Sequence, residues 1–99
     1  MDEIIGLTCG TYDAITPSDL SNFKHFKTIC DKLIIGLKPS FQNSFEERIT
    51  LLKLIPFVDD IIIFEDINIL KKNNYDLIFI NSKEIFKQTD FKVPIYYFN

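Results

Sequence analysis

Five short runs of apolar residues, each bounded by polar or charged residues, divide the chain. Each run is continuous and has the length of a buried strand, about 4–8 residues. We expect these strands at 4–9, 33–37, 60–64, 76–80 and 93–98. Continuous apolar strands are typical of a parallel sheet that is covered on both faces, because neither side of the strand then meets water.

The segment after the first strand carries the signals of a helix start. Thr16 stands in the N-cap position, Pro17 follows at the first helical position, and Asp19 lies three residues after Thr16. This spacing predicts a reciprocal cap between Thr16 and Asp19. Apolar residues at intervals of three continue the helix to about Cys30.

Three further helices are expected between the later strands. Ser44 and Glu47 have the spacing of a second capping box, and Pro56 ends the helix that they open. Shorter helices are expected at 66–72 and 82–88. Strand and helix therefore alternate, which predicts an α/β fold: a three-layer, doubly wound parallel five-stranded sheet in a single domain over residues 1–99. Ligands of such sheets bind beyond the carboxyl ends of the strands.

Composition and charge exclude several classes of protein. The 99 residues are 46% hydrophobic and 25% charged, which excludes a disordered tail. With a formal charge of −3, no large basic surface is expected, so no nucleic-acid partner is predicted. No apolar run approaches the ~18 residues of a membrane span. An acidic N-terminus and only two cysteines favour a cytoplasmic protein over a secreted disulfide scaffold.

The loop after the first strand reads Gly10-Thr11-Tyr12-Asp13, followed by Thr16 and, three residues on, Asp19. It resembles the Gly-x-Phe-Asp-x-x-His-x-Gly-His signature of the cytidylyltransferase-like nucleotidyltransferases, above all the glycerol-3-phosphate and phosphoethanolamine or phosphocholine cytidylyltransferases. The blocks at 30–36, 44–48 and 58–62 resemble further segments of that family. The resemblance covers roughly residues 4 to 98.

This resemblance implies a strand order of 3-2-1-4-5 and a nucleotide site in the first loop. It makes Lys38 and Arg48 candidate substrate or phosphate contacts. An active member would use magnesium with a nucleoside triphosphate. The family often dimerises, which makes 56–60 the candidate contact of a homodimer. The implied nucleotide-binding positions are Gly10, Thr11, Tyr12, Asp13, Thr16 and Asp19.

The chain departs from the family where catalysis is concerned. Thr16 and Asp19 replace the two histidines that bind the triphosphate. A carboxylate near a polyphosphate is repulsive, by ~1 kcal/mol or more at surface dielectric. The Gly-Asp-Asp segment after the fourth strand reads Asn-Ser-Lys-Glu at 81–84, and the Arg-containing closing loop has no counterpart before Asn99. No catalytic residue can be assigned, and a conserved fold without most of the catalytic groups is expected.

Each candidate also has a structural interpretation. Gly10 to Asp13 can be a strand-to-helix turn that local hydrogen bonds of Asp13 hold, and Thr16 and Asp19 can be a cap. Lys38 can be solvated. Arg48 can pair with one of three carboxylates: Glu46, Glu47 and Asp59.

The remaining chemistry-bearing residues point to no site. His25 is expected to be exposed, and Cys9 and Cys30 to be small buried hydrophobes. No cluster has metal-ligand spacing, and the acidic pairs beside the third strand, 59–60 and 65–66, are expected to be solvated. Three functions stay open: a degenerate, non-catalytic nucleotide-binding or interaction module, an active nucleotidyltransferase with a rebuilt site that makes a CDP- or ADP-linked product, and a structural homodimer unit.

Overall fold

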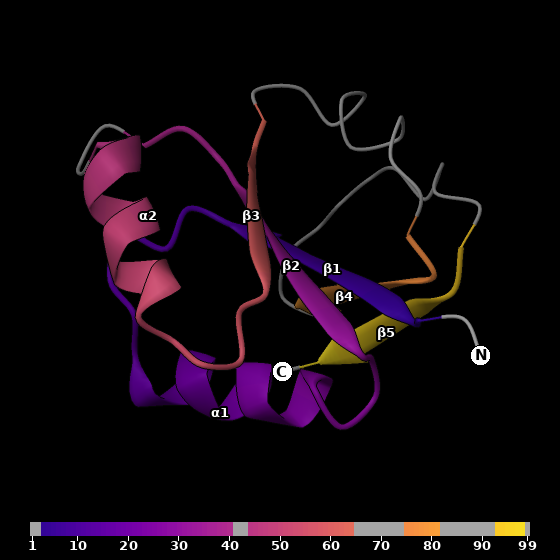
Figure 1. Cartoon of the computed structure of the whole chain (residues 1–99). Coiled ribbons are helices and arrows are strands. Elements are labelled where there is room, and N and C mark those ends of the chain that lie inside the picture. Colours follow the sequence, from indigo (N-terminus) through magenta and orange to yellow (C-terminus); the bar gives the residue numbers. More distant parts are fainter. Residues whose placement is uncertain (1–2, 41–43, 65–74, 82–92, 99) are drawn as a thin grey trace.

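The computed structural model describes residues 3–40, 44–64, 75–81 and 93–98. Five strands form one sheet in which every described pairing is parallel (Figure 1). The order is β3-β2-β1-β4-β5, which confirms the predicted α/β fold and strand order. The strands are β1 (Ile5–Gly10), β2 (Lys32–Leu37), β3 (Asp60–Ile63), β4 (Leu77–Asn81) and β5 (Ile95–Phe98).

The central strand β1 is where the strand order reverses. Leu7 of β1 is in register with Ile34 of β2 on one side and with Ile78 of β4 on the other. The chain passes from β1 to β2 and β3 on one side, and then to β4 and β5 on the other side of β1. The carboxyl ends of β1 and β4 therefore flank the topological switch point, where open α/β sheets bind their ligands.

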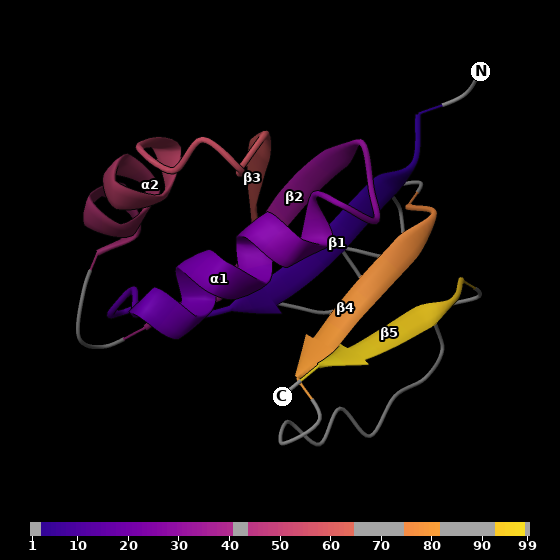
Figure 2. The ribbon, with the colours of Figure 1, turned by 90° about the horizontal axis from the view of Figure 1, so that it is seen from below.

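Helices α1 (Pro17–Phe26) and α2 (Phe45–Lys53) lie on the same face of the sheet (Figure 2). Phe26 of α1 stacks on Phe79 of β4 with ring centroids 4.0 Å apart, and Leu52 of α2 is fully buried in the same cluster. A second cluster, which includes Leu7 and Ile78, covers the opposite face. The helices expected at 66–72 and 82–88 lie outside the described residues.

Helix α1 is shorter than predicted. It ends at Phe26, whereas the apolar spacing predicted a helix to about Cys30. The amide and hydroxyl of Thr28 both donate to the carbonyl of His25, at 3.0 and 2.6 Å. These bonds to the carbonyl three residues earlier form a turn in place of the four-residue bonding of an α-helix. Cys30, beyond the turn, is still buried.

The cap of α2 is also simpler than predicted. The Ser44 hydroxyl accepts a hydrogen bond from the Glu47 amide at 3.2 Å, as expected of an N-cap. Among the described contacts the Glu47 carboxylate makes no return bond, so only half of the predicted capping box is formed. The Glu47 amide, which has no partner within the helix, is nevertheless hydrogen-bonded.

Aspartates that directly precede strands fasten the amino-terminal edge of the sheet. Asp31, just before β2, accepts the Ile4 amide at 2.7 Å through Oδ2. Asp76, just before β4, accepts the Ile5 amide at 2.8 Å in the same way. Both carboxylates therefore bind the start of the neighbouring strand β1. They accept hydrogen bonds from backbone amides that would otherwise lack a partner there.

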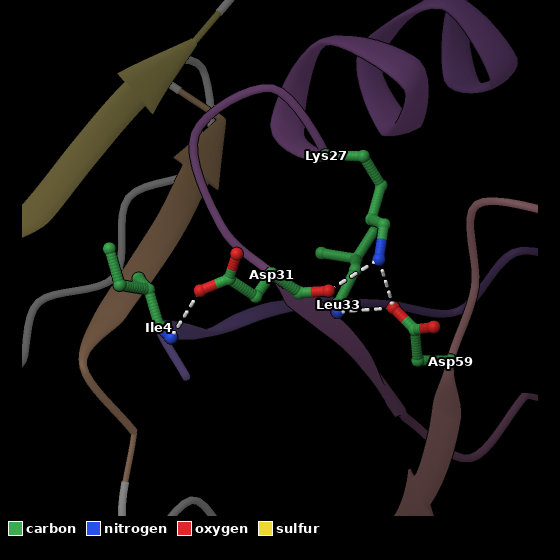
Figure 3. A network of polar contacts seen from close by, with 5 residues as sticks. All are labelled: Ile4, Lys27, Asp31, Leu33 and Asp59. Atoms are coloured by element: carbon green, nitrogen blue, oxygen red, sulfur yellow. Dashed lines mark hydrogen bonds and ion pairs between the residues drawn. The ribbon is translucent and has the colours of Figure 1, made fainter. Parts of the chain in front are cut away.

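A third aspartate repeats this arrangement one strand further out (Figure 3). Asp59, just before β3, accepts the Leu33 amide of β2 at 2.8 Å. The same Oδ2 atom accepts a hydrogen bond from Lys27 Nζ at 2.7 Å. Lys27 Nζ also donates to the Asp31 carbonyl at 2.6 Å. Asp59 is an exposed strand end, as predicted, but it is also bonded, because this carboxylate joins the end of α1 to β2 and β3.

Candidate functional site

A cavity of about 440 Å³ opens at the carboxyl ends of β1, β4 and β5, beside the first turn of α1. Its wall brings together all six residues of the predicted nucleotide site: Gly10, Thr11, Tyr12, Asp13, Thr16 and Asp19. The sequence did not predict that six other residues line this cavity: Cys9, Ala14, Ser18, Asn22, Asn81 and Phe98. Asn81 and Phe98 end β4 and β5, so the predicted strand order is a signal that could have placed them there.

Tyr12 forms an aromatic wall of this cavity in a strained conformation. Its φ is 50°, in the left-handed region that a bulky residue rarely adopts. Its ring packs edge-on against Phe23 with centroids 5.5 Å apart. A Cβ at Gly10 would lie 3.0 Å from a ring carbon of Tyr12, so glycine lets the ring fold over the end of β1. The contacts on both sides hold the ring in place.

The first turn of α1 is closed by its own side chains, as predicted. The Thr16 amide donates to Asp19 Oδ2 at 2.9 Å, and the Asp19 amide donates to Thr16 Oγ1 at 3.2 Å. The Thr16 hydroxyl also donates to Asp19 Oδ2, at 3.0 Å. Of the first three helical residues, Pro17 has no N–H and the Asp19 amide is used by the capping box. Only the Ser18 amide lacks a partner within the box.

Asp13 connects two loops. The Ser40 hydroxyl donates to Asp13 Oδ1, across 27 positions of sequence. This contact, which the sequence did not predict, ties the loop after β1 to the loop after β2. The Asp13 carboxylate therefore contributes to the shape of the cavity as well as to its negative charge.

Arg48 is the largest fully buried side chain of the described residues, with 2% of its surface exposed. Its Nη1 atom donates to the carbonyl of Thr11 at 2.7 Å and to the carbonyl of Lys38 at 2.6 Å. Its Nε atom donates to the Ser44 carbonyl at 3.2 Å, and the guanidinium lies 4.7 Å from the ring centre of Phe45. The guanidinium thus binds both loops of the site from behind.

These contacts differ from the ion pair that was one interpretation of Arg48. Within the described residues it pairs with none of the expected carboxylates, because Asp59 binds Lys27 and the guanidinium points to backbone carbonyls. It does not line the cavity either. No spacing rule could have shown this, since the carbonyls it binds belong to loops far apart in sequence.

Lys38 likewise stands outside the cavity wall. Its amide donates to the Gly10 carbonyl at 2.9 Å and its carbonyl accepts the bond from Arg48. Its backbone therefore extends the pairing of β1 and β2 into the loops. Lys38 and Arg48 therefore lie next to the loops of this cavity, and their role as substrate or phosphate contacts stays a prediction.

His25 is exposed, as predicted, and its Nε2 lies 3.1 Å from the Tyr96 hydroxyl of β5. Cys30 is buried, as predicted, and burial raises the pKa of its thiol. Cys9 differs from its expectation, because it is half-buried and lines the cavity. Both cysteines are free thiols.

The described side chains around the cavity do not by themselves form a complete magnesium site. Magnesium prefers several oxygen ligands in near-octahedral geometry. The Asp19 Oδ2 atom is already bonded to the amide and hydroxyl of Thr16, and Asp13 Oδ1 is bonded to Ser40. In the part of the chain that the structure describes, no three His, Cys, Asp or Glu residues gather at metal-binding distance.

Comparison with known proteins supports the fold. No family model matches the chain, and no curated protein matches it. The lipopolysaccharide core biosynthesis protein from Thermoplasma volcanium GSS1 superposes with a TM-score of 0.84 over 99% of this chain and 98% of that chain. The two are 14% identical, so the likeness shows the fold alone. None of the described helices is long and apolar enough to cross a bilayer.

Proposed function

We propose that the chain is a degenerate cytidylyltransferase-like domain that does not catalyse nucleotidyl transfer and acts as a nucleotide-binding or interaction module. The observation that carries this proposal is the closed cap at the start of α1. There the Asp19 carboxylate binds the Thr16 amide, and Thr16 Oγ1 binds the Asp19 amide. A nucleotidyltransferase of this type would present histidines to a triphosphate at these two positions.

The electrostatics support the same proposal. The N-terminus of a helix attracts anions through its free amides and its dipole. In α1, Pro17 lacks an amide proton, the Asp19 amide is used, and the Asp19 carboxylate already supplies the negative charge. A second negative charge 4 Å away would be opposed by about 4 kcal/mol at an effective dielectric constant of 20. Transition-state charge would therefore be destabilised at the place where the family stabilises it.

Turnover is the experiment that separates this function from an active transferase. We expect no pyrophosphate release from CTP and magnesium with glycerol-3-phosphate, phosphocholine or phosphoethanolamine. The triple variant Thr16→His, Ser18→Gly and Asp19→His should gain affinity for CTP, because it removes the carboxylate and adds two donors. Pyrophosphate release by the unchanged protein would overturn the proposal.

A structural homodimer is the second candidate, and an exposed apolar surface favours it. Leu54, at the end of α2, is 74% exposed, and Ile63 of the edge strand β3 is 45% exposed. Ile63 lines a hollow of about 600 Å³ together with Lys53 and Asp60, and Leu54 directly follows Lys53 in the chain. In a two-fold dimer each copy could present Leu54 to the hollow of the other, with opposite charges at the rim.

Light scattering coupled to gel filtration tests this dimer. We expect a dimer mass for the unchanged protein and a monomer mass for Leu54→Glu. Leu20→Glu is the matched control, because Leu20 is 40% exposed but belongs to α1, away from the 56–60 segment. A monomer mass for the unchanged protein at high concentration would reject the dimer.

A further inference from the structure

The cavity at the carboxyl ends of β1 and β4 carries negative charge, which is unusual for a site that would bind nucleotides. Among the described residues of its wall, Asp13 and Asp19 carry carboxylates, and lysine, arginine and histidine are absent. Arg48 contacts Thr11, but its guanidinium is buried behind the loop and does not reach the wall. Fixed charges of one sign in a cleft repel ligands of the same sign and attract neutral or opposite ones.

The cavity can still hold a small molecule of moderate size. Its volume of about 440 Å³ lies in the range of ligand pockets, roughly 300–1,000 Å³. The Tyr12 and Phe98 side chains supply flat apolar surface, and Tyr12 is fixed by its contact with Phe23. Hydroxyl and amide groups of Thr11, Ser18, Asn22 and Asn81 stand between them. This mixture suits a planar ring with uncharged hydrogen-bonding groups.

We infer that the ligand of this cavity is an uncharged nucleoside, and that Asp19 is a specificity determinant which excludes its phosphorylated forms. The carboxylates can accept hydrogen bonds from sugar hydroxyls or from an exocyclic amino group. They cannot donate to a phosphate, and the cap leaves few amides that could. The inference rests on the proposed function, which makes this cavity the binding site of a non-catalytic domain.

Calorimetric titration with cytidine, CMP and CTP, and with the adenosine series, tests the inference in the absence of magnesium. We expect affinity to fall with each added phosphate, with the nucleoside binding about tenfold or more tightly than its triphosphate. Asp19→Asn keeps an acceptor for the Thr16 amide but removes the charge. This variant should bind the triphosphate several-fold more tightly, so the ratio of nucleoside affinity to triphosphate affinity should fall several-fold.

Two further variants make the result specific to the cavity. Asp60→Asn changes the net charge by the same unit at β3, outside the cavity wall, and should change neither affinity. Tyr12→Gly removes the aromatic wall, and glycine adopts a φ of 50° without strain, so the backbone of the loop can keep its conformation. Nucleoside affinity should then fall several-fold.

The outcomes distinguish the inference from the function on which it rests. Tighter binding of CTP than of cytidine, without turnover, overturns the inference and leaves a non-catalytic nucleotide-binding domain. The absence of binding by every nucleoside at millimolar concentration also overturns it. Pyrophosphate release from CTP, by contrast, overturns the proposed function itself.

Discussion

Lys27 Nζ lies 2.7 Å from Asp59 Oδ2, so the end of helix α1 is joined to the start of the edge strand β3. Partial burial by itself would raise the pKa of the Asp59 carboxyl. The hydrogen bonds from Lys27 and from the Leu33 amide, with the positive charges of Lys27 and Lys32, outweigh burial and hold that pKa below its ordinary value of 3.8. The ionised form of Asp59 is therefore the one that stabilises the fold.

Acid should weaken this contact. Because the folded-state pKa of Asp59 is depressed, its contribution is present above about pH 4 and is lost as the pH falls through the folded value. We expect Asp59→Asn to be less stable than the unchanged protein at pH 7 and to lose less stability below pH 4. Urea unfolding at a series of pH values measures this. Parallel curves for the two proteins below pH 4 would contradict it, and Asp60→Asn is the control.

Removal of the Arg48 guanidinium should destabilise the protein strongly. Arg48→Met leaves the carbonyls of Thr11 and Lys38 without these buried donors, at a cost of about 2–3 kcal/mol. The free energy of unfolding of Arg48→Lys should lie between those of the unchanged protein and of Arg48→Met, because a single ammonium cannot reproduce the planar, multiply donating guanidinium. Chemical denaturation measures both. Lys53→Met is the control, because it changes an exposed residue of the same helix. Its free energy of unfolding should stay within about 0.5 kcal/mol of that of the unchanged protein.

The cap of α1 should contribute modestly to stability. Asp19→Ala removes the acceptor of the Thr16 amide and should cost ~0.5–1 kcal/mol. Asp19→Asn should lose less, since its side-chain oxygen can still accept that bond. Thermal denaturation of the two variants beside the unchanged protein measures the difference. Unchanged stability of Asp19→Ala together with a loss of ligand affinity would show that Asp19 binds a ligand directly.

The two cysteines should differ in reactivity. Cys9 is half-buried in the cavity wall, whereas Cys30 is 4% exposed and burial raises the pKa of its thiol. Iodoacetamide should therefore label Cys9 well before Cys30 in the folded protein, and peptide mass spectrometry can follow both. Cytidine should slow the labelling of Cys9 without changing that of Cys30. Equal labelling rates for the two thiols in the folded protein would contradict this.

The sequence was sufficient to predict elements whose partners are local or periodic. The apolar runs predicted five strands, and the spacing of Thr16 and Asp19 predicted a cap that the structure contains. Contacts made between distant loops could not be predicted in this way. Arg48 binds carbonyls ten and thirty-seven positions away, and Asp59 binds Lys27 thirty-two positions away. Such partners depend on the folded arrangement, and no residue type or spacing reveals them.

The aspartates at 31, 59 and 76 have a consequence for how this domain can evolve. Each fixes the start of one strand against its neighbour, so a slip of one residue would break a charge-assisted hydrogen bond as well as turn every side chain to the wrong face. Strand alignment is thus secured at the amino-terminal edge. The opposite edge, where the cavity lies, is free to exchange its loop residues, so a lineage could lose one ligand chemistry and acquire another while the sheet stays the same.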